Sequence, residues 1–563
     1  MRMGSGVARR WTLSAALLTG ALWTSLAVAP ATAIPPDALP LRLIAFRDLH
    51  GSLLPPQGPR SEVVRSDGAS VPAGGAAYLA AYVRQLRSQA DNSVLYSVGD
   101  TWGSSPIESA MFHDEPTVDL LNGLDVTAAA LGNHEFDNGY AELQRLRDGG
   151  CHPEGCRYDE EFAGATFPLI AANVADADGS PAALPFTVDY VDGVPVGVIG
   201  IAPHDTPQVV RGDDIAGLQF TDEITAVDRT ADALDALGVR SIVLLYKGAL
   251  TPPAGTDPCD ATAGPARSLA TRVSPKVDVI VTADGDDSFN CSYPDPAGSP
   301  RTVLQGASHG RIISVADLTI DRESRDVLRD RTHAFNQIVT HDITPDPRTQ
   351  QFVDRAVDES RDVAERVVGR IAADLTRDTA PSGESALGNL VADAQLAAAE
   401  PAGAQLALTN PGGVRADLLH SGDGVVTYGD AYAAQPFGNR LQVLELTGAE
   451  LVGILEQQFQ QDGTGAGRER ILAPSHTLRY VLDRAAAPGS RIRDVTIADR
   501  PLDAAAAYRV VVNGFLAEGG DGFTGFTQAR RATGAGAELD ALNDYLAQHA
   551  PVPPPATDRI ALP

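Results

Sequence analysis

Acidic, imidazole and amide side chains follow three separate apolar runs near the start of the sequence. In chain order these residues are Asp48, His50, Asp100, Asn133 and His134. Asp48 and His50 are two residues apart, so they share one face of an extended segment. A two-metal hydrolase uses such a set, because one carboxylate bridges two cations about 3.5–4 Å apart and a bound hydroxide attacks phosphorus. The pattern therefore predicts a divalent metal centre that acts on a phosphate ester.

An α/β layered domain is needed to bring these side chains together. Short apolar runs alternate with helical stretches as far as residue 340, and near-continuous apolar runs are typical of buried central strands. In such sheets ligands collect at the carboxyl ends of strands, where the polar residues stand. The predicted strands are 41–46, 94–98, 127–131, 167–173, 194–201, 242–245 and 277–281, and predicted helices include 75–90 and 223–237.

The chain of 563 residues is too long for one ordinary hydrophobic core, so at least two domains are expected. A charged helical stretch separates two α/β patterns. The predicted divisions are a signal peptide (1–33), a first α/β domain (34–344), a connector helix (345–371), a second α/β domain (372–550) and a Pro-rich tail (551–563).

The N-terminal segment has the composition of a secretion signal. Arg2, Arg9 and Arg10 form a basic start, an apolar stretch follows, and Ala31 and Ala33 supply a small-x-small cleavage site. No later stretch has about 18 continuous apolar residues, so we expect no membrane anchor and a secreted protein. The formal net charge of −29 argues against nucleic acid or an anionic membrane as a partner.

Four cysteines suit an oxidising compartment. Cys151 and Cys156 flank a short loop, and Cys259 and Cys291 bracket a longer one. The expected disulfides are therefore 151–156 and 259–291, with four free thiols as the alternative.

The stretch 132–137 reads Gly-Asn-His-Glu-Phe-Asp and resembles the signature of metallophosphoesterases, specifically that of the 5′-nucleotidase family. The metal ligands that the resemblance implies are Asp48 and His50 on one ion, Asp100 between two ions, and Asn133 on the second ion. It also implies that His134, oriented by Asp137, stabilises the transition state near the leaving group.

Three histidines that the family usually supplies are replaced. Tyr246 stands at the first of these positions, and Asp284 and Asp286 stand at the other two. Arg47 takes the place of the usual Asn. Imidazole suits zinc, whereas carboxylate suits magnesium, calcium and manganese, so the expected cofactor is one or two divalent ions of Mn, Mg, Ca or Zn.

Two arrangements of the altered centre remain open, beside an eroded site with little or no metal. In the first, a harder ion is held by Asp48, His50, Asp100 and Asp286, with Asp284 also pointing inward. In the second, one metal site is empty and Lys247 supplies a positive charge nearby.

The second domain contains five stretches that match the substrate domain of the same family: 384–390, 410–415, 427–430, 436–439 and 513–523. The resemblance implies that Phe437 and Phe515 sandwich a base and that Asp521 accepts from ribose hydroxyls. It also implies that Asn410 and Arg415, on the Gly-rich turn containing Gly413, hold the base edge or the phosphate side. Gly383 departs from family members that carry Arg there.

The sequence narrowly favours an extracellular, metal-dependent phosphomonoester hydrolase that acts on nucleotides, because six residues of the centre persist. The alternative is a nucleotide-binding protein with a weakened or inactive centre. A surface-interaction role without a small ligand is a third possibility, and the retained ligand-type turns count against it.

Overall fold

The computed structural model describes residues 38–248, 256–259, 264–285, 287–461 and 467–563. The predicted signal peptide and the predicted metal ligand Asp286 lie outside these residues. Among the described residues, no helix is long and apolar enough to span a membrane.

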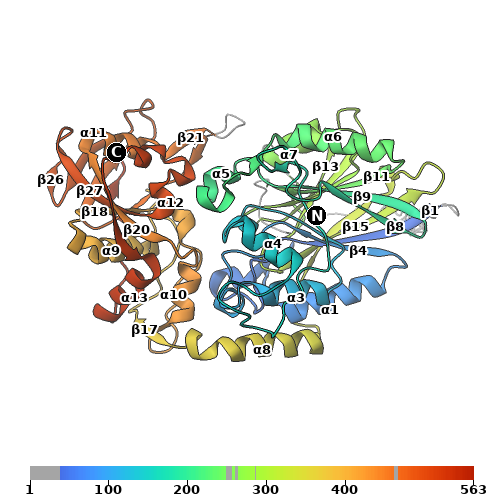
Figure 1. The fold of residues 1–563 in the computed structure, drawn as a ribbon, viewed down its shortest axis with the longest axis horizontal. Coiled ribbons are helices and arrows are strands. Elements are labelled where there is room, and N and C mark those ends of the chain that lie inside the picture. Colours follow the sequence, from blue (N-terminus) through green and yellow to red (C-terminus); the bar gives the residue numbers. More distant parts are fainter. Residues whose placement is uncertain (1–37, 249–255, 260–263, 286, 462–466) are drawn as a thin grey trace, which may run out of the picture. The chain divides into compact units, whose positions relative to one another are not determined.

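Two six-stranded sheets form the centre of the N-terminal domain (Figure 1). In spatial order the first sheet consists of β16 (His333–Ile338), β15 (Ile312–Asp321), β1 (Ala38–Phe46), β4 (Ser93–Val98), β5 (Ala128–Ala130) and β6 (Leu169–Ile170). The second consists of β13 (Phe289–Pro294), β14 (Pro300–Gln305), β12 (Val279–Ala283), β11 (Ser241–Lys247), β9 (Val194–Ile201) and β8 (Phe186–Val191).

Side-chain alternation along the strands builds four layers. Leu41 and Leu43 of β1 join Val196 and Val243 in a core between the two sheets. Phe46 faces the opposite way, toward a core formed with helices α1 (Ala76–Ser88), α3 (Glu115–Gly123) and α4 (Tyr140–Asp148). A third core joins the second sheet to α6 (Glu223–Ala236) and α7 (Pro265–Arg272). The result is an α/β/β/α sandwich, which agrees with the α/β layered domain predicted from the sequence.

The C-terminal domain is also α/β. Its five-stranded sheet consists, in spatial order, of β23 (Ala473–Pro474), β18 (Leu406–Thr409), β27 (Ala507–Asn513), β20 (Arg440–Thr447) and β28 (Ala532–Ala537). Its four-stranded sheet consists of β26 (Arg500–Pro501), β25 (Ile492–Ile497), β24 (Leu478–Leu482) and β29 (Ile560–Ala561). Its helices are α9 (Ala386–Ala399), α10 (Tyr428–Ala434), α11 (Gly448–Glu456), α12 (Gly514–Ala517) and α13 (Glu538–Gln548).

Two segments differ in detail from the expected divisions. The connector contains helix α8 (Pro347–Ala364), but residues 367–370 form strand β17 (Val367–Arg370), which pairs with β19 (Val425–Thr427) of the C-terminal domain. The Pro-rich tail is packed on the same domain. Its strand β29 pairs with β24, and the guanidinium of Arg559 is buried.

Helix α8 begins at a side-chain cap. The Asp346 carboxylate accepts from the backbone N–H of Thr349 at 2.7 Å, and Pro347 occupies the first helical position. Asp346→Ala removes this acceptor, so we expect the free energy of unfolding to fall by about 0.5–2 kcal/mol. Thermal unfolding followed by circular dichroism measures the change. Asp354→Ala, on the same helix but away from the cap, is the control, and equal losses in the two variants would contradict the capping role.

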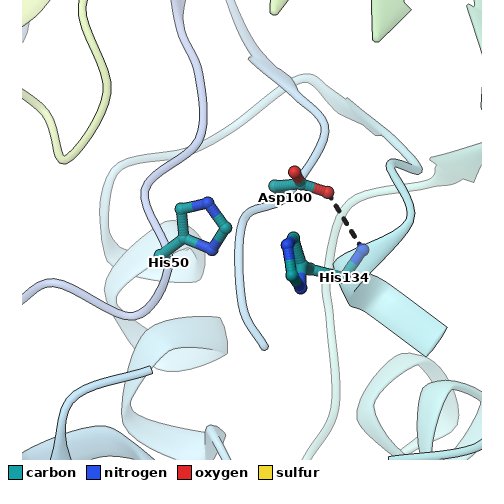
Figure 2. Close-up of side chains that lie close together, drawn as sticks. All are labelled: His50, Asp100 and His134. Atoms are coloured by element: carbon teal, nitrogen blue, oxygen red, sulfur yellow. Dashed lines mark hydrogen bonds between the residues drawn. The ribbon is translucent and has the colours of Figure 1, made fainter. Parts of the chain in front are cut away.

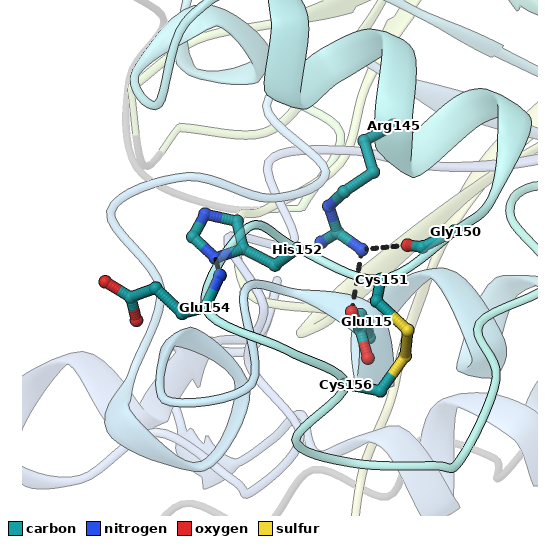
Figure 3. Close-up of a disulfide and its surroundings, with 7 residues drawn as sticks. All are labelled: Glu115, Arg145, Gly150, Cys151, His152, Glu154 and Cys156. Atoms are coloured by element: carbon teal, nitrogen blue, oxygen red, sulfur yellow. Dashed lines mark hydrogen bonds and ion pairs between the residues drawn. A yellow bond between two sulfur atoms is a disulfide. The ribbon is translucent and has the colours of Figure 1, made fainter.

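Both predicted disulfides are present: Cys151–Cys156 and Cys259–Cys291. Figure 3 shows the first beside Arg145, which donates to the carbonyl of Gly150 at 2.8 Å and to the carboxylate of Glu115 at 2.7 Å. These contacts fix the short loop against α3.

Candidate functional site

Loops from both domains line one cavity of about 1070 Å³, within the compact unit Asp37–Pro563. Every predicted metal-ligating, catalytic and substrate-binding residue that the structure describes is on its wall. These residues are Asp48, His50, Asp100, Asn133, His134, Asp137, Asp284, Asn410, Gly413, Arg415, Phe437, Phe515 and Asp521. The structure thus brings together side chains that are almost 500 positions apart in sequence.

The backbone is strained where the first-sheet strands deliver these residues. Asp48, His50 and Asp100 have φ angles of 44°, 49° and 47°, in the left-handed region that non-glycine residues seldom adopt. Each such residue costs about 1–3 kcal/mol and persists only where its surroundings enforce it. Strain at three residues of one cluster supports a functional role for that cluster.

Glu135 ties the loops after β4 and β5 together. Its buried carboxylate accepts from the backbone N–H groups of Asp100, Thr101 and Gly132 at 3.0, 2.6 and 2.6 Å. Burial and the nearby Asp100 charge raise the pKa of Glu135 to about 8. Sequence analysis assigned this residue no role, although it lies in the motif that carries the family resemblance.

His50, Asp100 and His134 offer ligand atoms that all lie within 4.8 Å of one another (Figure 2). The Asp100 carboxylate accepts from the backbone N–H of His134 at 3.0 Å. His50 donates from Nδ1 to the Gly103 carbonyl at 3.0 Å, which leaves its Nε2 with a lone pair. Burial holds the pKa of His50 well below its ordinary value, so the ring is neutral.

His134 connects the two domains. Its Nδ1 donates to Asp137 at 2.7 Å, as expected from the resemblance. Its Nε2 accepts from the Arg415 guanidinium at 3.5 Å, and Arg415 also donates to the Ser104 hydroxyl at 2.9 Å. Arg415 therefore places a positive charge of the second domain beside the imidazole of the first.

The ammonium of Lys247 lies among the carboxylates of the centre. Its Nζ is 2.9 Å from Asp48 Oδ1, 2.7 Å from Asp100 Oδ2 and 3.5 Å from Asp284 Oδ1. Burial alone would lower the pKa of Lys247, but the three carboxylates outweigh burial and raise it. Burial likewise opposes ionisation of Asp100, yet the Lys247 ammonium keeps its pKa below the ordinary value. Lys247 is therefore charged at neutral pH.

Strand alternation explains why Lys247, and not Tyr246, reaches this position. On β11, Val243 and Leu245 face the core between the sheets, whereas Tyr246 faces the outer core under α6. Lys247 lies on the same face of β11 as Val243 and Leu245, so its side chain points toward the ends of β1 and β4. The position at which the family has a metal-ligand histidine carries instead a tyrosine that packs with the outer core and also lines the cavity.

Arg47 is a second buried cation beside the centre. Its guanidinium pairs with the Asp48 carboxylate and donates to the carbonyls of Gly306, Gly285 and Asp287 at 2.7, 2.7 and 3.0 Å. Its side chain is 1% exposed. Arg47 thus anchors the loop after β12, which carries Asp284.

A metal pair bridged by Asp100 does not fit these residues. Divalent ions lie about 2.0–2.6 Å from ligand oxygens, and the Lys247 ammonium already contacts the oxygens of Asp48 and Asp100. The family's histidine ligands are also absent at the two replaced positions that the structure describes. Tyr246 packs with the outer core, and the Asp284 side chain is 57% exposed. Between Asp48 and Asp100, the Lys247 ammonium therefore occupies the place of a bridged metal pair.

Polar residues of the second domain surround Asp521. Its Oδ2 accepts from Asn410 at 2.9 Å, and its Oδ1 pairs with Arg470 at 3.0 Å. Asn410 in turn accepts from Asn513 at 3.1 Å. Gly413 is required beside this network, because a Cβ atom there would lie 2.9 Å from the Asn410 side-chain oxygen. The carboxylate is thereby fixed facing the cavity.

Two phenylalanines, Phe437 and Phe515, line the cavity. The Arg415 guanidinium lies 5.8 Å from the Phe437 ring centre, and the His134 ring stacks at 6.0 Å with an interplanar angle of 16°. Phe515 lies over Gly520, where an added Cβ would come within 2.5 Å of the ring. Because Gly520 has no side chain, the Phe515 ring can pack directly against its backbone.

Sequence analysis missed many residues on the cavity wall, among them Ser104, His309, Gln460 and Arg470. His309 accompanies His50 at a ring distance of 5.6 Å, and its Nδ1 contacts the Ser52 hydroxyl at 2.9 Å. A histidine in the Ser-His-Gly turn between β14 and β15 was an available signal. Arg470 gave none, because its partner Asp521 is distant in sequence.

Comparisons with known proteins agree with this geometry. Residues 367–528 match the family described as "5'-nucleotidase, C-terminal domain". The cell wall protein Lmo0130 of Listeria monocytogenes is 30% identical over 91% of this chain and 67% of its own length. The endonuclease YhcR of Bacillus subtilis is 29% identical over 86% of this chain, which spans only 37% of that protein.

The crystal structure of a 5′-nucleotidase precursor from Thermus thermophilus matches with a TM-score of 0.76 and 27% identity, covering 93% of this chain and 99% of that one. The layered sandwich, the joined C-terminal domain and the shared cavity are the architecture of a two-domain phosphoesterase family. The chain belongs to the 5′-nucleotidase family.

Proposed function

We propose that this chain is an exported protein that binds a nucleoside phosphate in the cavity between its domains. The observation that carries the proposal is that Phe437, Phe515 and Asp521 line the same cavity as Arg415. Aromatic rings stack on any base, the carboxylate accepts from ribose hydroxyls, and the guanidinium matches phosphate oxygens. Export is supported by the basic-apolar leader and the two disulfides.

Metal-dependent hydrolysis of a nucleoside monophosphate, with Mn, Mg, Ca or Zn, is the second candidate. The hydrogen-bonded pair of His134 and Asp137 favours it, because the carboxylate holds the imidazole in a fixed orientation on the cavity wall, as general acid–base catalysis requires. The Lys247 ammonium between Asp48 and Asp100 counts against it. Binding without efficient turnover is therefore our preferred function.

Calorimetric titration of the purified chain with AMP, adenosine and inorganic phosphate tests the proposal. We expect AMP to bind more tightly than either fragment, because it engages both the rings and Arg415. AMP hydrolysis is measured in parallel with each metal and with EDTA. Metal-dependent turnover that disappears in Asp100→Asn would establish the hydrolase instead. A folded protein that binds no nucleotide would contradict both candidates.

A further inference from the structure

We infer that Lys247 is a built-in cation that replaces the divalent metals, so that this site receives a ligand phosphate without any metal ion. The inference rests on the proposed function for the nature of the ligand. The replacement itself rests on the geometry of the centre alone.

The contacts of the ammonium match what a lysine can donate. Its three N–H bonds are met by three carboxylates: Asp48, Asp100 and Asp284. Asp100, the residue expected to bridge two metals, makes the shortest of these contacts at 2.7 Å. One ammonium thus joins the two carboxylates that a metal pair would otherwise join.

Arg47 completes the replacement from the other side of Asp48. It holds three backbone carbonyls, two of which belong to the loop after β12. In the family resemblance, this loop carries two of the metal-ligand positions. Two cations of the chain therefore balance most of the charge of three carboxylates and also order the loop.

A ligand phosphate has a defined place in this arrangement. The Asp284 contact is the longest of the three, at 3.5 Å, and Asp284 is the exposed member of the set. A phosphate oxygen that displaces the Asp284 carboxylate would accept a hydrogen bond from Lys247. The Arg415 guanidinium, beside His134, would donate to the other phosphate oxygens. The anion would then lie between the cation of one domain and the cation of the other.

The wild-type protein gives the first test, since it needs no substitution. AMP affinity is measured by calorimetry after dialysis against EDTA and again with Mn²⁺ or Zn²⁺, and the metal content is measured by elemental analysis. We expect the AMP affinities with and without added metal to agree within about two-fold. We also expect no stoichiometric metal in the purified protein and the same melting temperature with and without EDTA. Tight binding of one or two ions per chain, or loss of AMP binding on chelation, would overturn the inference.

Lys247→Met removes the charge and keeps most of the stem. We expect it to weaken AMP binding in EDTA by about 10-fold or more and to create a Mn²⁺ site at Asp48 and Asp100. Lys276→Met is the matched control, because the chain's other lysine pairs with Asp232 and Asp235 at an exposed position. A folded Lys247→Met variant with unchanged AMP affinity and no new metal binding would contradict the inference.

The outcomes separate this inference from the proposed function. Wild-type protein that binds no AMP but also takes up no metal, with an EDTA-insensitive melting temperature, refutes nucleotide binding and supports the replacement. AMP binding that requires a metal ion supports nucleotide binding and refutes the replacement of the metals by Lys247. If Lys247→Met does not fold, the wild-type metal titration decides alone.

Discussion

Replacing Phe437 and Phe515 together by alanine is expected to weaken nucleotide binding by roughly 30-fold to 10⁴-fold. Stacking of a base on an aromatic ring contributes about 1–3 kcal/mol, and the proposed function places both rings on one base. Either single substitution should lose about half of this free energy. Calorimetric titration with AMP measures the effect.

Phe335→Ala is the control, because this phenylalanine is partly buried in the N-terminal domain and is not among the residues that line the cavity. We expect its affinity to stay within about two-fold of wild type, as for a change remote from the ligand. An AMP affinity that survives in the double variant would place the base elsewhere.

Arg559→Met should be the most destabilising single change in the C-terminal domain that we consider. The guanidinium contacts both oxygens of Asp393, at 3.0 and 2.7 Å, and donates to the carbonyl of Pro474 at 2.6 Å. Both side chains are at least nine-tenths buried. Breaking a buried pair by removing one partner costs about 3–5 kcal/mol, because the other charge stays buried and unpaired.

Urea unfolding of the full chain measures this loss. The control is Arg479→Met, whose exposed guanidinium contacts Asp558 in the same region. We expect that change to stay within about 0.5 kcal/mol. Similar midpoints for the two variants would show that Arg559 is not an anchor.

Much of the fold follows from local pattern. The runs 41–46 and 194–201 coincide with the core of β1 and all of β9, because buried central strands are continuously apolar. Strands β13 and β16 were missed, because neither contains a continuous buried apolar run. Buried residues alternate with more exposed ones along β13, and only Asn336 is buried on β16. Their position depends on pairing with distant strands.

The sequence predicted which residues form the site better than it predicted which of them contact one another. Residues at strand ends converge because parallel strands end at one edge, so Asp48, Asp100 and His134 meet as expected. The place of Lys247 near the centre was one of the two arrangements left open by the sequence, and it follows from period-two alternation on β11. The Asp521–Arg470 pair could not be predicted, because nothing local encodes a contact between two loops.

The pairing of β1 with both β4 and β15 bears on how the chain is made. Strand β1 ends at Phe46, and its neighbour β15 begins at Ile312, so one edge of β1 stays open until most of the N-terminal domain has been synthesised. Such long-range pairing makes folding slow. During synthesis, the first sheet therefore stays incomplete until the residues of β15 have been added to the chain.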